Sequence, residues 1–595
     1  MNYLAMLKAL PKKDRGQLRQ LSTDFKYTGL KEYPRPQMER SSYINLNGKW
    51  DYRIIDGQGQ VASSGQIVVP FSPETLLSGT DMHVLRPEET LEYTRIIKVD
   101  RLRTGKRLML NFGAVDQVAY VFINGQSVGS HEGGYTAFTM DITDYVTEGE
   151  NTLVVKVRDY MDTVGYARGK QSLTPGGMWY QGQSGIWQTV WMEWVPDIYI
   201  RSLLITPDID NNRLRIRLDV PEAKGQVEVL SEDAKLIKEY RVVAVDEEEL
   251  QIEVRLGPTK LWTPDNPVLY NLTINYGKDS VKTYFAMRVF GVAKDKRGIP
   301  RLTLNHEPMF FNGVLDQGYY PESLMTPPSD EAMIYDITTM KELGFNMLRK
   351  HAKVEPMRWY YHCDRLGMVV WQDIVNGGTA YNMNMICNLP TAVRPFGKTE
   401  DKNRLFMKFT GRNTPESKSV WYKEASEIVN QLANVPSIGQ WVIFNEGWGQ
   451  FNAAYCTKYI RGLDRTRPVD SASGWFHENC GDVYSEHYYF EPLHIVKTEW
   501  PFVISEYGGY TRRVEDHYYS DAVYGYKHFE DEQGLQVEFD NTMDLVELLI
   551  EDGLCGAVYT QLSDVEDELN GLLTYDRKLT KIQKRRTITD ESDGD

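Results

Sequence analysis

Hydrophobic positions in the first third of the chain recur at every second residue, in short runs separated by turn sequences. Such runs occupy residues 108–112, 119–123 and 153–157, and the second run is followed directly by Asn124-Gly125. A period of two residues interrupted by Asn-Gly and Gly-Gly turns is typical of antiparallel strands. We therefore predict an N-terminal β-sandwich over residues 1–197.

The same alternation continues with shorter spacing over residues 198–293. Residues 202–206, 214–218 and 226–230 each form a run in which apolar side chains alternate with polar ones. This length and pattern suit one small sandwich, so we predict an immunoglobulin-like β-sandwich here.

From about residue 294 the pattern changes to apolar runs that alternate with amphipathic helical stretches. Eight β/α units within about 280 residues match the size of a TIM (β/α)8 barrel, which we predict over residues 294–580. The eight expected strands lie near residues 310–314, 346–351, 368–373, 440–446, 469–473, 482–489, 501–507 and 556–561.

Two of these expected strands end in glutamates. The run at 440–449 leads into Asn445-Glu446, which Gly447 follows directly, and the run at 501–509 leads into Glu506, which is followed by Tyr507 and then by two glycines. Parallel barrel strands deliver their terminal side chains to one catalytic rim. Two carboxyl groups that face one cavity are the equipment for glycosidic bond cleavage, about 5–5.5 Å apart in retaining enzymes and 6.5–9.5 Å in inverting ones.

The two glutamates have different neighbours along the chain, which predicts different roles. Glu446 follows an amide and lies among aromatic residues, Phe444 and Trp448 among them. An apolar setting raises a carboxyl pKa and favours the protonated acid. Glu506 lies beside hydroxyl-bearing residues that can hold an ionised nucleophile.

The composition of the chain limits the kinds of molecule that it is expected to bind. The chain has 67 Lys and Arg against 83 Asp and Glu, a net charge of −16, which argues against nucleic acid or an anionic membrane as partner. A small neutral glycoside or oligosaccharide is the expected substrate. The 5 cysteines contain no Cys-x-x-Cys pair, and the first residues do not resemble a secretory signal, so a cytoplasmic protein is expected.

Two charged segments have no predicted catalytic role. The acidic run at 564–568 is interpreted as an exposed loop after strand eight rather than a cation site. The last twenty residues are densely charged, and residues 581–595 are predicted to form a solvated, disordered tail.

At these motifs the chain resembles glycoside hydrolase family 2, which includes β-galactosidases, β-glucuronidases and β-mannosidases. The resemblance implies that the first sandwich is a sugar-binding jelly-roll domain, followed by an immunoglobulin-like sandwich and a catalytic barrel. It is carried in the first domain by Leu46-Asn47-Gly48-Lys49-Trp50, by residues 122–125 and 131–135, and by Gly185-Ile186-Trp187.

The resemblance also implies roles for particular residues. Glu446 matches the family's acid/base and Glu506 its nucleophile. Asn445 matches the asparagine that binds the sugar 2-hydroxyl, and Arg349 the arginine that closes strand two. Tyr488 matches a strand-six tyrosine that contacts the nucleophile, whereas His487 and Glu486 on the same strand are less favoured.

The sequence departs from the family pattern near Arg349. Family members often have a histidine three residues after this arginine, where this chain has Ala352, so His351 is proposed as a stand-in. Trp371 and Asp373, in a Trp-Gln-Asp run reminiscent of β-mannosidases, are further candidates to contact the substrate.

Gln561, at the end of strand eight, completes the substrate-binding set. No Asn-x-Lys triplet follows Gln561, although common β-glucuronidases use one to hold the uronate carboxylate. The magnesium site of some large β-galactosidases in this family includes a histidine in the region before the acid/base. No histidine occurs here between His362 and His477, so the resemblance implies no catalytic metal and no cofactor.

These observations predict a retaining exo-β-glycosidase, with β-galactosidase as the first guess and β-glucuronidase or β-mannosidase as alternatives. Transglycosylation and a non-catalytic carbohydrate-binding protein are the competing interpretations. The aperiodic segment 376–414 is expected to wall the pocket and to set leaving-group preference. A homo-oligomer is compatible with the family.

Overall fold

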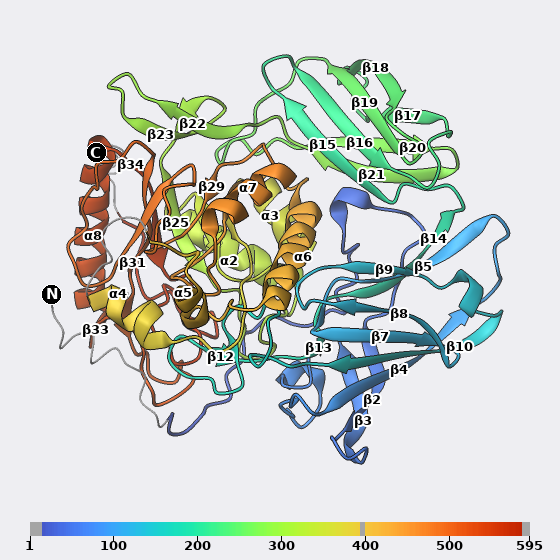
Figure 1. The fold of residues 1–595 in the computed structure, drawn as a ribbon, viewed down its shortest axis with the longest axis horizontal. Coiled ribbons are helices and arrows are strands. Elements are labelled where there is room, and N and C mark those ends of the chain that lie inside the picture. Colours follow the sequence, from blue (N-terminus) through green and yellow to red (C-terminus); the bar gives the residue numbers. More distant parts are fainter. Residues whose placement is uncertain (1–14, 393–398, 586–595) are drawn as a thin grey trace, which may run out of the picture.

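The chain folds into two β-sandwiches and a parallel barrel. The computed structural model describes residues 15–392 and 399–585. Both sandwiches lie on the right of Figure 1, one above the other, and the barrel with its helices lies on the left. The predicted architecture of jelly roll, immunoglobulin-like sandwich and TIM barrel is confirmed.

The N-terminal sandwich packs a four-stranded sheet against a six-stranded sheet. Its strands alternate as the sequence predicts: in β2, Trp50, Tyr52 and Ile54 are buried while Asp51 and Arg53 face solvent. In sheet order the strands are β1 (Ile44–Asn45), β14 (Val190–Pro196), β5 (Lys106–Phe112) and β9 (Phe138–Asp141), and then β3 (Val61–Val69), β2 (Gly48–Ile55), β4 (Thr90–Val99), β10 (Gly149–Arg158), β7 (Val118–Ile123) and β8 (Gln126–Glu132).

The second sandwich pairs a four-stranded and a three-stranded sheet. In β16, Leu214, Ile216 and Leu218 enter the core between exposed arginines. The first sheet is β15 (Ser202–Asp208), β16 (Arg213–Asp219), β19 (Glu249–Leu256) and β18 (Ile237–Ala244), and the second is β17 (Val227–Leu230), β20 (Tyr270–Tyr276) and β21 (Asp279–Phe285).

The barrel is one parallel eight-stranded sheet that is nearly closed. At its seam, between β29 and β30, the Asp482 N–H donates to the Val469 carbonyl over 2.7 Å. The Asp482 carboxylate in turn accepts from the Val469 N–H over 2.9 Å. Along the chain the strands are β25 (Phe311–Asp316), β26 (Met347–Lys350), β27 (Val369–Asp373), β28 (Ile438–Val442), β29 (Val469–Asp470), β30 (Tyr484–Tyr488), β31 (Phe502–Gly508) and β34 (Leu554–Thr560).

The major barrel helices begin at side-chain caps. Ser329, Thr414 and Asp531 each accept a backbone N–H in the first turn of α2, α6 and α8. The expectation of eight complete β/α units is wrong in one respect, because residues 471–483 and 489–501 connect their strands without a helix. The longer helices are α2 (Asp330–Glu342), α3 (Met357–Leu366), α6 (Pro415–Leu432), α7 (Ala453–Leu463) and α8 (Glu532–Asp552), and the short helices α4 (Leu389–Ala392) and α5 (Arg404–Phe409) lie between α3 and α6.

A small antiparallel sheet packs with the apolar interior of the barrel. It consists of β22 (Phe290–Lys294), β23 (Pro300–Leu304) and β24 (Glu307–Pro308). Phe290 belongs to the same buried cluster as Phe311 and Trp371. The Trp371 and Phe311 ring centroids are 5.8 Å apart. Trp371 precedes Asp373 by two residues, so it lies on the same strand face one layer deeper in the barrel.

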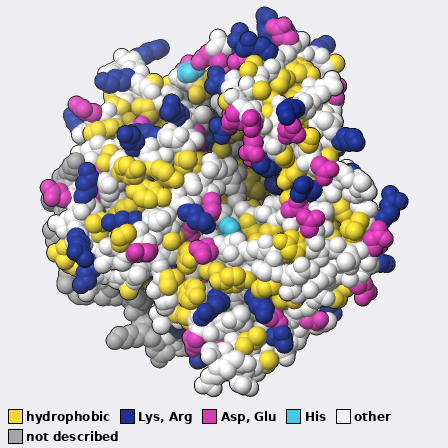
Figure 2. Space-filling model, turned by 45° about the vertical axis from the view of Figure 1, so that its right-hand side comes forward, with side chains coloured by type: hydrophobic (Ala, Val, Ile, Leu, Met, Phe, Trp, Pro, Cys, Tyr) yellow, Lys and Arg dark blue, Asp and Glu magenta, His cyan; other side chains and the backbone are white. Residues whose placement is uncertain are grey.

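The three units leave a cavity of about 660 Å³ where they meet. Its lining includes Phe138 of the jelly roll, Leu203 of the second sandwich and Arg358 of α3. Figure 2 shows that the corresponding face is hollowed between the two sandwiches. Among the described residues, no helix is both long and apolar enough to cross a membrane.

The position of Trp371 predicts a packing role. We expect Trp371→Leu to lower the free energy of unfolding of the barrel by about 3 kcal/mol, because a large side chain is removed from a close-packed interior. Denaturant unfolding followed by circular dichroism would measure this loss. Trp500→Leu, at a half-buried loop position, is the matched control. Unchanged stability in Trp371→Leu together with a large rise in KM would contradict the packing role.

Candidate active site

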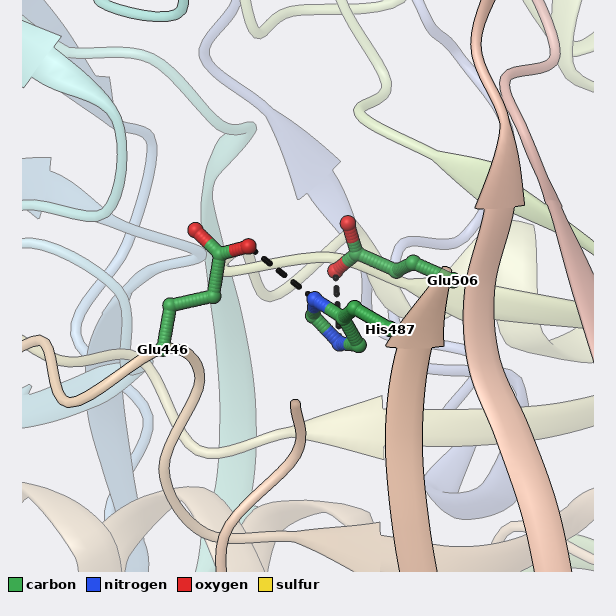
Figure 3. Close-up of side chains that lie close together, drawn as sticks. All are labelled: Glu446, His487 and Glu506. Atoms are coloured by element: carbon green, nitrogen blue, oxygen red, sulfur yellow. Dashed lines mark hydrogen bonds and ion pairs between the residues drawn. The ribbon is translucent and has the colours of Figure 1, made fainter. Parts of the chain in front are cut away.

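Glu446 and Glu506 face each other at the carboxyl-terminal rim of the barrel. Figure 3 shows both carboxyl groups directed into the space between their strands. Glu506 lies within β31, whereas Glu446 follows β28 by four residues, in a turn. The Glu446 backbone has φ of 49°, a left-handed conformation that is costly for a residue with a side chain. One carboxyl oxygen of each residue lies within 4.8 Å of the other.

Arg349 connects three of the predicted site residues. Its Nη1 donates to Glu506 Oε1 over 3.0 Å, and its Nη2 donates to Asn445 Oδ1 over 2.8 Å. Its Nε lies 3.0 Å from Asp373 Oδ1. The guanidinium is completely buried, so these charge-assisted bonds act in a medium of low dielectric constant. Arg349 therefore fixes the positions of Glu506, Asn445 and Asp373 together.

His487 lies between the two glutamates, as Figure 3 shows. Its Nδ1 is 3.0 Å from Glu446 Oε1, and its Nε2 is 3.5 Å from Glu506 Oε1. The sequence did not favour this residue. The pairing of β30 with β31 shifts between Glu486 and His487, and this bulge sets His487 opposite Glu506. No simple alternation pattern would have found it.

The tyrosine that contacts the nucleophile candidate is Tyr489 rather than Tyr488. The Tyr489 hydroxyl donates to Glu506 Oε2. The Tyr488 hydroxyl instead lies 3.3 Å from His494 Nε2, and its side chain is buried among core residues. Tyr489, one residue after the predicted Tyr488, therefore makes the contact expected of the family's strand-six tyrosine.

Burial raises the pKa of both carboxyl groups. The pKa of Glu446 rises to about 7, since desolvation outweighs the opposing charges of Lys170 and Arg349. At Glu506 burial also raises the pKa, against the charges of His487 and Arg349. Two carboxyl groups this close together hold one proton between them at neutral pH. Because Arg349 lies 3.0 Å from Glu506 and Tyr489 donates to it, we assign this proton to Glu446 and the negative charge to Glu506.

Three polar atoms at the site have no hydrogen-bond partner within the described residues. They are Nε2 of His351, Nδ2 of Asn445 and Nε1 of Trp448. The His351 and Trp448 ring centroids are 5.7 Å apart. Buried polar atoms are normally paired, so these three are suited to meet the hydroxyl groups of a ligand.

The acidic run at 564–568 is buried, and the expectation of an exposed loop is wrong. Each of its carboxylates has a cationic partner from elsewhere in the chain. Asp564 pairs with Lys581 over 2.6 Å, Glu566 and Asp567 with Arg15 over 2.7 and 2.9 Å, and Glu568 with Lys170 over 3.3 Å. Three cations of the protein itself therefore pair with the four carboxylates of the run, and Arg15 serves two of them.

The predicted tail at 581–595 lies mostly outside the described residues. At its start, Lys581 and Ile582 are buried and belong to the folded barrel.

Lys170 reaches the barrel from a jelly-roll segment near β11 (Gln171–Ser172), so the first domain contributes to the rim.

Gln561 follows β34 and is fully buried. Its Nε2 donates to Glu568 Oε2 over 3.2 Å and to Asn570 Oδ1 over 2.8 Å. Its Oε1 accepts from Gln317 Nε2 over 2.8 Å. The structure thus joins Gln561 to the site through side-chain hydrogen bonds that sequence reasoning missed, since Gln317 and Glu568 lie in segments without a motif.

The segment 376–414 packs beside the site, apart from residues 393–398, which lie outside the described residues. Ile386 joins Trp448, Trp475 and Phe476 in one buried cluster. The Trp475 Nε1 donates to the Ile386 carbonyl over 2.8 Å. Its proposed control of leaving-group preference stays a prediction.

One group of side chains in the described part of the chain has metal-ligand spacing. Glu446, His487 and Glu506 each offer an atom within 4.8 Å of the others. These are the carboxyl pair and the imidazole that bridges them. The expectation that catalysis needs no metal stays a prediction.

Comparison with known families supports this arrangement domain by domain. Residues 77–196 match the sugar binding domain of glycosyl hydrolases family 2. Residues 198–288 match the family's second domain, and residues 298–585 match its TIM barrel domain. This chain belongs to glycoside hydrolase family 2.

Known relatives are distant. A β-galactosidase of Halalkalibacterium halodurans is 24% identical over 461 residues, which cover 73% of this chain and 42% of that protein. The chain thus spans less than half the length of this curated relative. Among solved structures, an uncultured Clostridium β-glucuronidase matches with TM-score 0.69 and 18% identity, covering 91% of this chain and 97% of that one.

A β-galacturonidase of Eisenbergiella tayi, solved with galacturonate, also matches with TM-score 0.69 and 20% identity over 93% of this chain and 97% of that chain. At such identities these likenesses show the shared fold.

The raised pKa of Glu446 predicts the pH dependence of hydrolysis. The acid is protonated below about pH 7 and loses its proton above it, so kcat/KM on a nitrophenyl β-glycoside should fall as pH rises through about 7. In Glu446→Gln, assayed with a dinitrophenyl leaving group that needs no protonation, this alkaline limb should vanish. An identical alkaline limb in the variant would assign it to another group.

Proposed function

We propose that this enzyme is a retaining exo-β-glycosidase, with a β-galactoside as its first-choice substrate. The observation that carries the proposal is the pair of buried carboxyl groups with oxygens within 4.8 Å, bridged by His487. This spacing suits direct attack by a carboxylate, since an inverting enzyme needs 6.5–9.5 Å to admit water.

The arrangement supports a double displacement. Glu446 gives its proton to the glycosidic oxygen as the bond from that oxygen to C1 breaks, and a Glu506 oxygen bonds to C1 from the opposite face. The aglycone leaves as an alcohol, and the sugar remains as an ester of Glu506. The loss of the Glu506 charge lowers the pKa of Glu446, which can then accept a proton.

The second half-reaction uses the same groups. Glu446 takes a proton from water as the water oxygen bonds to C1, and the ester bond breaks to release the Glu506 carboxylate. Arg349 and Tyr489 hold the released carboxylate through the bonds they already make. Two inversions at C1 retain the β configuration.

A neutral sugar is favoured over a uronate for a local electrostatic reason. The nearby lysine, Lys170, is already paired with Glu568, and both side chains are buried. A uronate carboxylate would have to compete with Glu568 for this cation. The named β-galactosidase relative agrees with this choice, whereas the similar solved structures act on uronates, so β-glucuronidase and β-mannosidase stay as alternatives.

The five cysteines are free thiols, which a reducing compartment maintains, and we place the activity in the cytoplasm.

Substitution of the carboxyl pair tests the mechanism. Glu506→Gln should lower kcat by at least about 10³-fold because no nucleophile remains, and azide should rescue Glu506→Ala with an α-glycosyl azide product. Glu446→Gln should lose about 10²–10⁴-fold on poor leaving groups and much less on dinitrophenyl glycosides. Initial rates on nitrophenyl galactoside, glucuronide, mannoside and glucoside would name the sugar.

Asp516→Asn, outside the site, is a control for the handling of the variant proteins. The first product anomer, followed by proton NMR, should be β. An α-anomer as first product, or near-normal turnover in Glu506→Gln, would overturn the retaining assignment.

The aromatic side chains beside the site predict an aglycone-binding surface. The Trp179 ring lies 5.1 Å from Trp448 and 5.9 Å from Tyr381, and Tyr381 belongs to the segment 376–414. We expect Trp179→Ala to raise KM several-fold for aryl glycosides and to have little effect on alkyl glycosides, since only the aryl group stacks. Trp191→Ala is the control, and an equal effect on both substrate classes would argue against this surface.

A further inference from the structure

A chain of hydrogen bonds links Glu568 to His351 across the rim. Glu568 Oε2 lies 3.2 Å from Gln561 Nε2, and Gln561 Oε1 lies 2.8 Å from Gln317 Nε2. Gln317 Oε1 lies 3.0 Å from His351 Nδ1. All four side chains are buried, so water does not compete for these bonds.

Glu568 determines which groups in this series of hydrogen bonds donate and which accept. The same oxygen, Oε2, also receives the Lys170 ammonium at 3.3 Å and the Tyr180 hydroxyl. An ionised carboxylate accepts hydrogen bonds and donates none. Gln561 must therefore present its amide NH2 group to Glu568.

The orientation of Gln561 then dictates the rest. Its carbonyl oxygen faces Gln317 and requires a donor, so the NH2 group of Gln317 points toward it. The carbonyl oxygen of Gln317 is left to face His351 Nδ1, which must carry a hydrogen. Reversal of the two amides would place an amide oxygen against the Glu568 carboxylate, and a buried unmade hydrogen bond is costly.

His351 is neutral at physiological pH. Burial and the charges of Lys170 and Arg349 lower its pKa well below the ordinary value. A neutral imidazole carries one hydrogen, so with Nδ1 protonated the Nε2 atom has a free lone pair. This Nε2 is without a partner among the described residues, 3.7 Å from Asp373 Oδ2 and 3.9 Å from Glu506 Oε1.

We propose that the side chains of Glu568, Gln561 and Gln317, here called the rim relay, hold His351 in its Nδ1-H tautomer, so that Nε2 accepts a hydrogen bond from a hydroxyl of the glycone. The inference rests on the proposed glycosidase function and names the group that the pocket recognises there.

The groups around His351 Nε2 determine which chemical group of a ligand can bind there. Nε2, the Asp373 carboxylate and the Glu506 carboxylate are all acceptors, so the ligand atom between them has to donate. A sugar hydroxyl donates one hydrogen, whereas a carboxylate has none to give. His351 is thus a specificity-determining residue that admits a hydroxyl and rejects a uronate carboxylate at this position.

Nitrogen NMR tests the tautomer directly and independently of activity. In protein labelled with ¹⁵N-histidine, the His351 signals are those lost in His351→Gln. Protonated and unprotonated imidazole nitrogens resonate in separate ranges, and we expect an unprotonated Nε2 and a protonated Nδ1 in the unliganded enzyme. A protonated Nε2 in the wild-type protein would overturn the proposal.

Glu568→Gln tests the relay, because an amide at this end can either donate or accept. Nε2 should then become at least partly protonated. Glu566→Gln, the same substitution in the same buried run but paired with Arg15, should leave the tautomer unchanged. Gln561→Met interrupts the relay without removing a partner of the Lys170–Glu568 ion pair, and should act like Glu568→Gln if that variant folds poorly.

A panel of monodeoxy β-glycosides tests the recognition. In the wild-type enzyme, removal of the hydroxyl that meets Nε2 should lower kcat/KM roughly tenfold. In Glu568→Gln, removal of the same hydroxyl should cause almost no loss of kcat/KM, while the losses for the other hydroxyls stay as in the wild type. In Glu566→Gln the tenfold loss should persist. An equal penalty in wild type and Glu568→Gln at every position would refute the recognition step. Failure to cleave any β-glycoside would count against the proposed function, while the NMR result would still decide the tautomer.

Discussion

The site depends on one fully buried guanidinium. Arg349 lies in β26, and its three nitrogens reach Glu506 of β31, Asp373 of β27 and Asn445 beyond β28. A buried cation is tolerated only when its charge and hydrogen-bonding capacity are met, and here the groups that meet them are site residues. The energetic need of Arg349 for partners therefore also brings the residues of the candidate active site together.

The geometry of Glu446 complements this constraint. Its left-handed backbone turns the side chain out of the strand direction toward Glu506, and the Glu446 N–H bond to the Ser473 carbonyl over 3.0 Å secures the turn. The strain falls on the residue that gives and takes the proton in the proposed mechanism. Strain of this kind persists only where the surrounding structure determines it, as the hydrogen bonds around β28 and β29 do here.

Much of the fold, and the placement of the two candidate catalytic glutamates at one rim, could be predicted from sequence because the signals are local. Alternating runs gave the sandwiches, and an apolar strand ending in Asn445-Glu446 or Glu506 gave the rim. His487 and Tyr489 were missed because a bulge in β30 changes which residues face inward. Residues 564–568 were misjudged because their cations, Arg15, Lys170 and Lys581, come from other segments of the chain, two of them in the first third. Trp371 was a candidate for substrate contact, and nothing local indicates how deep in the barrel it lies.

The Lys170–Glu568 ion pair bears on how such an enzyme changes over evolutionary time. The lysine belongs to the first domain and the glutamate to the barrel, yet the charges of both act on the pKa of Glu446, the proposed acid/base. A substitution in a jelly-roll loop thus alters the electrostatics of catalysis without changing any barrel strand. Substitutions in the jelly-roll domain can therefore change the substrate range while the two glutamates stay the same. A barrel joined to another jelly roll that lacks Lys170 would leave the Glu568 carboxylate without its cation.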